Sequence, residues 1–363
     1  MTLPDEPEQA GPVLSEQHLH ASTLFDLRGT YVFPDEQELQ PTHSVHNYHA
    51  VPLNRDYLMV HTGVAVTLHH LPTQTRLWTI ACPSFNFAFH YQRQLLVLAP
   101  GDPAMALLVW DLRTGQILHR LTYEQDGRLS AVDLRGLAFS PDGGVLAVGM
   151  EGDIVLWDTT NGRLLQTLQT ECFDIYTITF HPTMKLLAAG SFNQLEIWIW
   201  ELLAGHLLHR WEEPEAFMED EREREPDRPY QVAFTPDGKF LLASCGEGGL
   251  RVWDVEQACE VPGPDTDLHA LFLTLAPDGQ LVAVSDEGRV VQVFEIGTWR
   301  LLHEFGGSYP SESFSPDGQV LATLHEFGDV SVWEVMTGKL LYQVWTSSND
   351  QAPPYLGKPN ITT

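Results

Sequence analysis

The sequence predicts an all-β protein, a seven-bladed β-propeller built from four-stranded antiparallel blades, with six blades as the alternative. Three observations predict this fold. A turn signal with the pattern Phe-Ser-Pro-Asp-Gly recurs along the chain, a short apolar run follows each copy, and a further apolar run ends in an aromatic residue and an acid. Because one four-stranded unit cannot cover both of its faces, we expect the units to stack radially and bury their faces on one another.

The repeat begins with the turn. FSPDG at 139–143 returns as FTPDG at 234–238, LAPDG at 275–279 and FSPDG at 314–318, and FHPTM at 180–184 is a weaker copy. Proline presets φ at the second turn position, and glycine accepts the positive φ that closes a tight β-turn. Each copy should therefore reverse the chain between the first and second strands of a unit.

The third run of each unit ends in an aromatic residue and an acid, and a turn such as TNG or MTG leads into a fourth run. Runs rich in Val, Ile, Leu and aromatics between such breaks are typical of short strands. We expect the aromatic residue to pack between blades and the acid to cap the following turn, so both are structural. The pairs are Trp110-Asp111, Trp157-Asp158, Trp200-Glu201, Trp253-Asp254, Phe294-Glu295 and Trp333-Glu334.

These ordered signals resemble the WD-repeat β-propeller family, which is named after the Trp-Asp pair. The resemblance implies seven blades, although the first copy is degenerate, with His70 at the Trp position. Blades are expected at about 43–81, 85–121, 134–169, 175–211, 230–262, 269–305 and 309–345.

The chain departs from the family in one element. The family carries a Gly-His pair before the first strand of a blade, and here Gly205-His206 follows a third strand instead. We therefore expect the family's polar network to be absent and apolar packing to stabilise the blades. The segment 22–33 is expected either to add a strand at the seam of the ring or to pack across its bottom.

Composition restricts the partners. The 363 residues include 49 acidic and 20 basic side chains, a net charge of −29. Such a surface repels phosphate backbones and anionic headgroups, so we expect no nucleic acid and no membrane as partner. The four cysteines have no regular spacing and the N-terminus lacks the features of a secretory signal, which predicts a cytoplasmic protein.

Three segments lie outside the repeats. We expect residues 1–21 to be a disordered acidic N-terminal segment, 22–346 to form the propeller and 347–363 to be a flexible tail. The acidic loop insertion at 212–229 has two interpretations. It is either a solvated loop or an arm that recruits a basic partner.

Catalytic motifs are missing from the sequence. It has no zinc-ligand spacing, no phosphate-binding glycine loop and no G-x-S-x-G motif. His119, His209 and His303 recur at one position of the fourth run, where we expect an exposed blade edge. We therefore predict no catalytic residues, no metal and no cofactor.

The loops between second and third strands and the loops between blades should share one end of the ring, which we call the top face. They are acidic and hold aromatic residues that no strand pattern directs inward, as at a protein interface. The prediction is a non-catalytic scaffold that binds a basic protein or peptide there, as one subunit of a larger complex. The alternative is a calcium-binding or enzymatic propeller using the same acidic loops. The predicted contact residues are Phe192 and Phe327 as anchors, with Phe173, Tyr309, Glu151, Asp153, Glu247, Asp286 and Glu287 around them.

Overall fold

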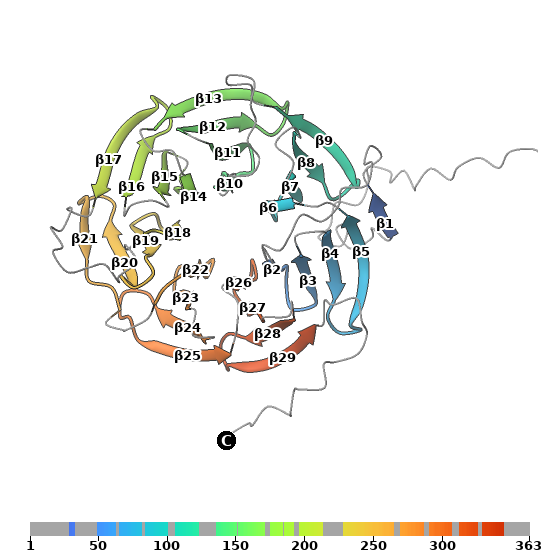
Figure 1. Ribbon diagram of the computed structural model, residues 1–363. Coiled ribbons are helices and arrows are strands. Elements are labelled where there is room, and N and C mark those ends of the chain that lie inside the picture. Colours follow the sequence, from blue (N-terminus) through green and yellow to red (C-terminus); the bar gives the residue numbers. More distant parts are fainter. Residues whose placement is uncertain are drawn as a thin grey trace, which may run out of the picture.

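The strands form seven sheets arranged as a ring (Figure 1). This computed structural model describes residues 29–32, 49–62, 65–81, 84–100, 106–122, 136–150, 152–170, 175–183, 185–191, 196–212, 228–264, 269–286, 290–306, 312–325 and 329–344. None of the described residues forms a helix long and apolar enough to cross a membrane. The expected terminal segments and most of the acidic insertion lie outside the described residues.

Each sheet is one blade whose four successive strands run from the centre of the ring to its rim. Seven blades are therefore confirmed, and the degenerate first copy is one of them. The first four blades contain β2 His49–Pro52, β3 Tyr57–His61, β4 Ala65–His70 and β5 Thr75–Ala81 (blade 1); β6 Ser84–His90, β7 Leu95–Pro100, β8 Leu107–Asp111 and β9 Gln116–Leu121 (blade 2); β10 Leu137–Phe139, β11 Val145–Met150, β12 Asp153–Asp158 and β13 Arg163–Gln169 (blade 3); β14 Ile175–Phe180, β15 Leu186–Ser191, β16 Glu196–Glu201 and β17 His206–Glu212 (blade 4).

The remaining blades follow the same order. They contain β18 Gln231–Phe234, β19 Phe240–Ser244, β20 Leu250–Asp254 and β21 Cys259–Val261 (blade 5); β22 Phe272–Leu275, β23 Leu281–Ser285, β24 Val290–Glu295 and β25 Leu301–Gly306 (blade 6); β26 Glu312–Phe314, β27 Val320–Leu324, β28 Val330–Glu334 and β29 Lys339–Val344 (blade 7). The strand β1, Gly29–Val32, pairs in parallel with β5 outside blade 1.

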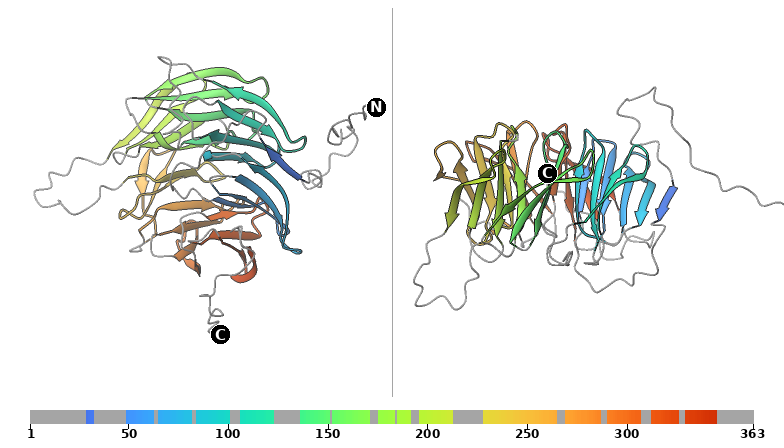
Figure 2. Two further views of the ribbon diagram at one scale, coloured as in Figure 1. Left: turned by 45° about the vertical axis from the view of Figure 1, so that its right-hand side comes forward. Right: turned by 90° about the horizontal axis from the view of Figure 1, so that it is seen from above.

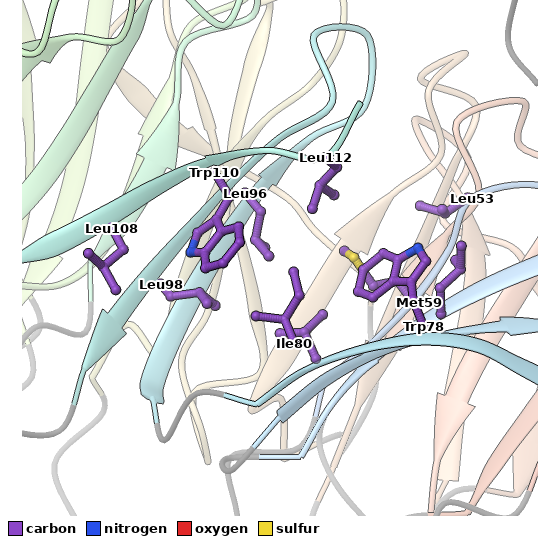
Figure 3. Packing of buried hydrophobic residues seen from close by; sticks show 11 residues of the cluster. Leu53, Met59, Trp78, Ile80, Leu96, Leu98, Leu108, Trp110 and Leu112 are labelled. Carbon is purple, nitrogen blue, oxygen red and sulfur yellow. The ribbon is translucent and has the colours of Figure 1, made fainter. Parts of the chain in front are cut away.

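Neighbouring blades are held together by buried side chains. Between blades 1 and 2, Trp78 from β5 and Trp110 from β8 belong to one cluster, and Figure 3 shows their indoles on either side of Ile80. Similar clusters join the other described blades. Because burial of apolar area contributes about 25 cal/mol per Å², these contacts between blades carry most of the stabilisation of the ring.

The ring closes by packing rather than by an exchanged strand. The innermost strand of blade 1, β2, lies beside β26 and β27 of blade 7. Leu58 and Val60 of blade 1 share a buried cluster with Val320 and Val330 of blade 7. The outermost strand of blade 7 is β29, and β1 adds to blade 1 only. Of the two expectations for 22–33, the described residues 29–32 therefore add an outer strand and do not cross the bottom.

The position of His70 is a correction to the sequence interpretation. Strand register pairs Leu146 with Trp157 in blade 3, and the corresponding residue in blade 1, Leu58, pairs with His69. His69 therefore stands at the Trp position and His70 at the acid position. The irregular repeat concealed this one-residue offset. His70 also acts as the acids do, because its Nδ1 bonds Thr73 Oγ1 across the turn at 2.6 Å.

A trace of the family's polar network occurs in blade 7. The indole Nε1 of Trp333 donates a hydrogen bond of 2.9 Å to Thr323 Oγ1. In blade 3 the residue at the register position of Thr323 is Val148, and Trp157 Nε1 has no hydrogen-bond partner among the described residues. Apolar residues fill this position in the other blades: Val60, Leu98, Ala189, Ala243 and Val284.

Glu312 breaks the pattern of the innermost strands. It faces blade 6 on the side of β26 that also carries Phe314, which packs between the two blades. It is 8% exposed, and Ser285 at the end of β23 is placed to hydrogen-bond its carboxyl group. Burial raises the pKa of Glu312 to about 8, although the adjacent Ser285 opposes the rise. At the same register position the other six blades carry apolar residues: Ala50, Phe87, Leu137, Ile178, Val232 and Leu273.

The closure of the ring gives the first testable prediction. Replacing Leu58 by Ala should lower the free energy of unfolding by about 2–5 kcal/mol, because it leaves a cavity between blades 1 and 7. Arg55 also pairs with Glu334 across this contact, but both side chains reach solvent, so Arg55→Ala should cost less. Urea unfolding followed by tryptophan fluorescence measures both. A larger loss for Arg55→Ala would contradict closure by apolar packing.

The buried carboxyl of Glu312 gives the second testable prediction. Between its unfolded pKa of 4.5 and its folded pKa of about 8, the folded state holds a proton that the unfolded state has released. Stability therefore falls as pH rises through this window, by about 1.4 kcal/mol per pH unit. Glu312→Val removes this effect and should stabilise the protein, by about 3 kcal/mol more at pH 7.5 than at pH 5.

The matched control is Glu304→Val, which removes an exposed carboxylate from a strand of the neighbouring blade. If the two variants showed the same pH dependence in urea unfolding, Glu312 would not titrate as described.

Candidate interaction surface

Seen edge-on, the ring is a disc whose strands run between two faces (Figure 2). The bottom face carries the turns between first and second strands and between third and fourth strands. The top face carries the turns between second and third strands and the connections between blades.

On the bottom face the acids of the Pro-Asp-Gly turns are used inside the turn. Asp142 Oδ1 accepts hydrogen bonds from the backbone N–H of Gly144 at 2.8 Å and from the hydroxyl of Ser140 at 2.7 Å. These bonds hold the pKa of Asp142 below its usual value. Asp237 binds Thr235 Oγ1 and the backbone N–H of Lys239 in the same way. The bottom acids therefore stabilise turns.

The aromatic-acid pairs lie at the ends of the third strands. The indoles of Trp110, Trp157, Trp200 and Trp253 are buried, and Trp333 is half-buried. Three of the acids accept hydrogen bonds from the backbone of the following turn. Asp111 Oδ1 accepts from the N–H of Arg113 at 2.9 Å, Asp158 Oδ1 from that of Thr160 at 2.8 Å and Asp254 Oδ1 from that of Gln257 at 2.8 Å.

Three of the predicted contact residues of the top face fall in the described part of the chain. Glu247 is exposed in the turn after β19, and Asp286 is half-buried and accepts a bond from the N–H of Val290 at 3.2 Å. Asp153 is 5% exposed, because β12 begins with it and strands cover it on both sides, so it does not belong to an exposed charged surface. The other predicted residues lie outside the described residues: Glu151, Phe173, Phe192, Glu287, Tyr309 and Phe327.

The top turn of blade 5 is fixed to its neighbour. The backbone N–H of Gly246 donates to Ala270 O at 2.7 Å, and Ser244 Oγ donates to Leu271 O at 2.8 Å, which links the turn to the start of blade 6. Glu247 therefore projects from a rigid support.

Two tyrosines lie close to this turn, and the sequence interpretation missed both. Tyr230 precedes β18 and packs against Gly246, and its ring lies 6.3 Å from that of Tyr176, edge to face. Arg228 lies over Tyr230 at 5.7 Å. We call Tyr176, Tyr230 and Glu247 the tyrosine rim. An aromatic residue where a connection between blades enters an innermost strand is the signal that could have identified them.

A second aromatic group lies at the top of blades 1 and 2. The rings of His49 and His61 lie 5.3 Å and 5.0 Å from that of Phe87. Burial lowers the pKa of His49 to about 4, so this imidazole is uncharged at neutral pH. His49 is thus a packing residue rather than a cation.

The described residues also expose leucines on the outer strands of three consecutive blades. We call this set the outer leucine row, and its side chains are 42% to 53% exposed. It consists of Leu118 on β9, Leu164 and Leu165 on β13, and Leu207 and Leu208 on β17. The turns between third and fourth strands on the bottom face also expose Leu203 and Met336.

The recurring histidines of the outer strands differ from the expectation of an exposed edge. His119 and His303 lie under turns of the next blade, against Gly162 and Gly338. His209 stacks on Trp211 with ring centroids 5.9 Å apart. All three are half-buried, and His119 and His303 are contacts between blades.

The described residues contain no cluster of candidate metal ligands. No three His, Cys, Asp or Glu side chains among them come together to hold a metal ion. A shallow pocket between the outer strands of blades 4 and 5 is lined by Trp211, Trp253, Arg251 and Glu260. The two charged residues bind each other there through two bonds of 2.7 Å.

Comparison with known proteins identifies the repeats. The family model "WD domain, G-beta repeat" matches residues 120–158 and 226–254. The chain is 25% identical over 213 residues to "WD repeat-containing protein SL1-17" of Schistosoma mansoni, which covers 56% of this chain and 62% of that protein. It is 33% identical over 110 residues to "Eukaryotic translation initiation factor 3 subunit I" of Pyricularia oryzae, a match that covers 30% of this chain and 28% of that protein. With "Small ribosomal subunit protein RACK1y" of Oryza sativa it shares 29% over 161 residues, covering 44% of each. Each match spans less than two thirds of the relative's own length.

Solved structures show the same fold at low identity. The "beta-propeller domain" of Cps50 (Swd1) from Myceliophteria thermophila superposes with a TM-score of 0.60 and 19% identity, over 72% of this chain and 85% of that one. Hydrazine synthase of Kuenenia stuttgartiensis also superposes with a TM-score of 0.60 and 16% identity, over 82% of this chain and 99% of that one. Likenesses at this level show architecture alone. The recurring turn and Trp-Asp signals, the seven four-stranded blades and the match to the repeat model together make this chain a member of the WD-repeat β-propeller family.

Proposed function

We propose that the protein is a non-catalytic scaffold that binds a basic protein or peptide through the top face of its propeller. The observation that carries the proposal is the tyrosine rim of the top face, where exposed Glu247 lies in a turn that packs against Tyr230, and Tyr230 in turn contacts Tyr176.

The tyrosine rim combines the groups that protein interfaces use. Aromatic side chains supply desolvated anchors, and charges around them steer a partner of opposite sign and exclude others. The net charge of −29 extends that steering over the whole molecule. A basic partner fits both the local and the overall charge.

The relatives support protein partners in general. One is named as a subunit of a translation initiation factor and another as a protein of the small ribosomal subunit. We propose that this chain is likewise a subunit of a larger complex.

The proposal predicts that the tyrosine rim retains a basic partner. Tyr176→Ala, Tyr230→Ala and Glu247→Gln combined should weaken capture of that partner from native lysate about tenfold, because they remove the aromatic anchors and one charge. Capture by wild type should also fall at high salt, as charge steering requires. The measurement is affinity capture read by mass spectrometry, with circular dichroism to show that the variant is folded.

The matched control changes the outer leucine row by Leu164→Ser, Leu165→Ser and Leu207→Ser. It should retain the partner as wild type does. Loss in this control with retention in the tyrosine-rim variant would move the interface to the outer strands and contradict the proposal. A variant with Phe192→Ser and Phe327→Ser tests the two anchors predicted from sequence in the same assay.

A further inference from the structure

We propose that the acidic N-terminal segment, residues 1–28, docks on the outer leucine row of blades 2, 3 and 4. This segment lies outside the described residues. The inference rests on the strands that would receive the segment, on its sequence and on the place where it joins the ring. It concerns the outer rim of the propeller and is independent of a partner at the top face.

Three leucines of the row share one structural position. Each is the bulge residue of an outer strand, skipped where that strand pairs with the third strand of its blade: Leu118 in β9, Leu165 in β13 and Leu208 in β17. Their side chains are 42%, 53% and 47% exposed. Three consecutive blades therefore expose a leucine that is half-buried at the same position of blades 1, 6 and 7, where it is Leu77, Leu302 and Leu341.

The strands that carry the row are basic, although the protein is acidic. β9 and β13 contain no Asp or Glu, and each exposes one arginine, Arg120 and Arg163. The chain as a whole has a net charge of −29. An acidic segment is therefore attracted to this part of the rim and repelled by the overall charge of the molecule. Exposed leucines bordered by arginines fit an occupant that combines apolar side chains with carboxylates.

The N-terminal segment has this composition. Residues 1–28 contain five acidic residues and one arginine. Among the acids they also contain the apolar residues Leu14, Leu19, Leu24 and Phe25. The apolar side chains match the exposed leucines, and the carboxylates match the arginines beside them.

Strand β1 brings the segment to the correct level of the rim. It pairs in parallel with β5, and Gly29 lies opposite Trp78, the fourth residue of β5. Because β5 starts at a bottom turn, the chain before Gly29 leaves β1 toward the bottom face. The exposed leucines are the second and third residues of β13 and β17 and the third residue of β9. They therefore lie at the level that the segment reaches directly beyond Gly29.

The segment is also long enough. Figure 1 shows β1 at the rim of the ring, with blade 2 and its outer strand β9 next along it. The 28 residues before β1 reach at most about 90–100 Å when extended, and packed sheets lie about 10 Å apart. The segment can therefore pass blade 2 and reach blades 3 and 4. Because it is tethered to the ring, its effective concentration there is high, so weak contacts hold it in place.

Photo-cross-linking within the full chain tests the inference. Leu19 is replaced by p-benzoylphenylalanine, which joins to C–H groups in contact with it on irradiation, and mass spectrometry maps the adducts. We expect adducts on β9, β13 and β17 within one chain. Leu118→Asp combined with Leu165→Asp should lower their yield about fivefold or more, because it removes two apolar contacts and repels the acidic segment.

The matched control is Leu301→Asp, which changes a leucine of β25 that is 43% exposed and lies outside the row. It should leave the yield and the positions of the adducts unchanged. A second variant, Arg120→Glu combined with Arg163→Glu, keeps the leucines and should also lower the yield, because it reverses the charge of the rim. Circular dichroism shows whether each variant is folded.

Three results would overturn the inference. The first is an equal yield of adducts in wild type and in the Leu118→Asp, Leu165→Asp variant. The second is adducts scattered over the protein or confined to another surface, which would mean that the segment does not dock on the row. The third is adducts that join two chains, which would assign the row to a second copy of the protein. None of these results bears on the partner of the top face, so failure here is distinct from failure of the proposed function.

Discussion

Every feature of this structure depends on one constraint: a four-stranded blade has two faces to bury and can bury them only on its neighbours. A ring satisfies this constraint for every blade at once. The chain meets it with side chains alone, since Leu58 and Val60 of blade 1 pack on Val330 of blade 7 without an exchanged strand. Contacts between blades therefore stabilise the scaffold, and the loops of both faces can vary in sequence without loss of this packing.

The same constraint makes exceptions informative. A polar side chain in a contact between blades is costly, so its presence calls for a reason. Thr323 has one, because it accepts the indole proton of Trp333. Glu312 is a second exception: it occupies a position that is apolar in the other six blades, and Ser285 of blade 6 is placed to hydrogen-bond it. Its burial makes the stability of the contact between blades 6 and 7 depend on pH.

Sequence alone predicted the repeat because turn chemistry and strand period are local. Pro-Asp-Gly turns and Trp-Asp pairs fix the order of strands within a blade, and seven blades followed. Strand register is not local. Sequence reasoning assigned the Trp position of blade 1 to His70, whereas His69 occupies it. It also gave no reason to single out Glu312, which is one acid among many in an acidic chain. Tyr176 and Tyr230 were missed for a similar reason, because their meeting joins two blades that are separate in sequence.

The central claim is that an acidic top face holds a basic partner, and zero-length carbodiimide cross-linking of the captured complex tests it most directly. This reagent joins a carboxylate to a lysine in contact with it, and mass spectrometry identifies both residues. The account predicts cross-links from Glu247 and Asp286 to lysines of the partner. Cross-links confined to Glu256 of a bottom turn or Glu304 of an outer strand would place the partner elsewhere and contradict the account.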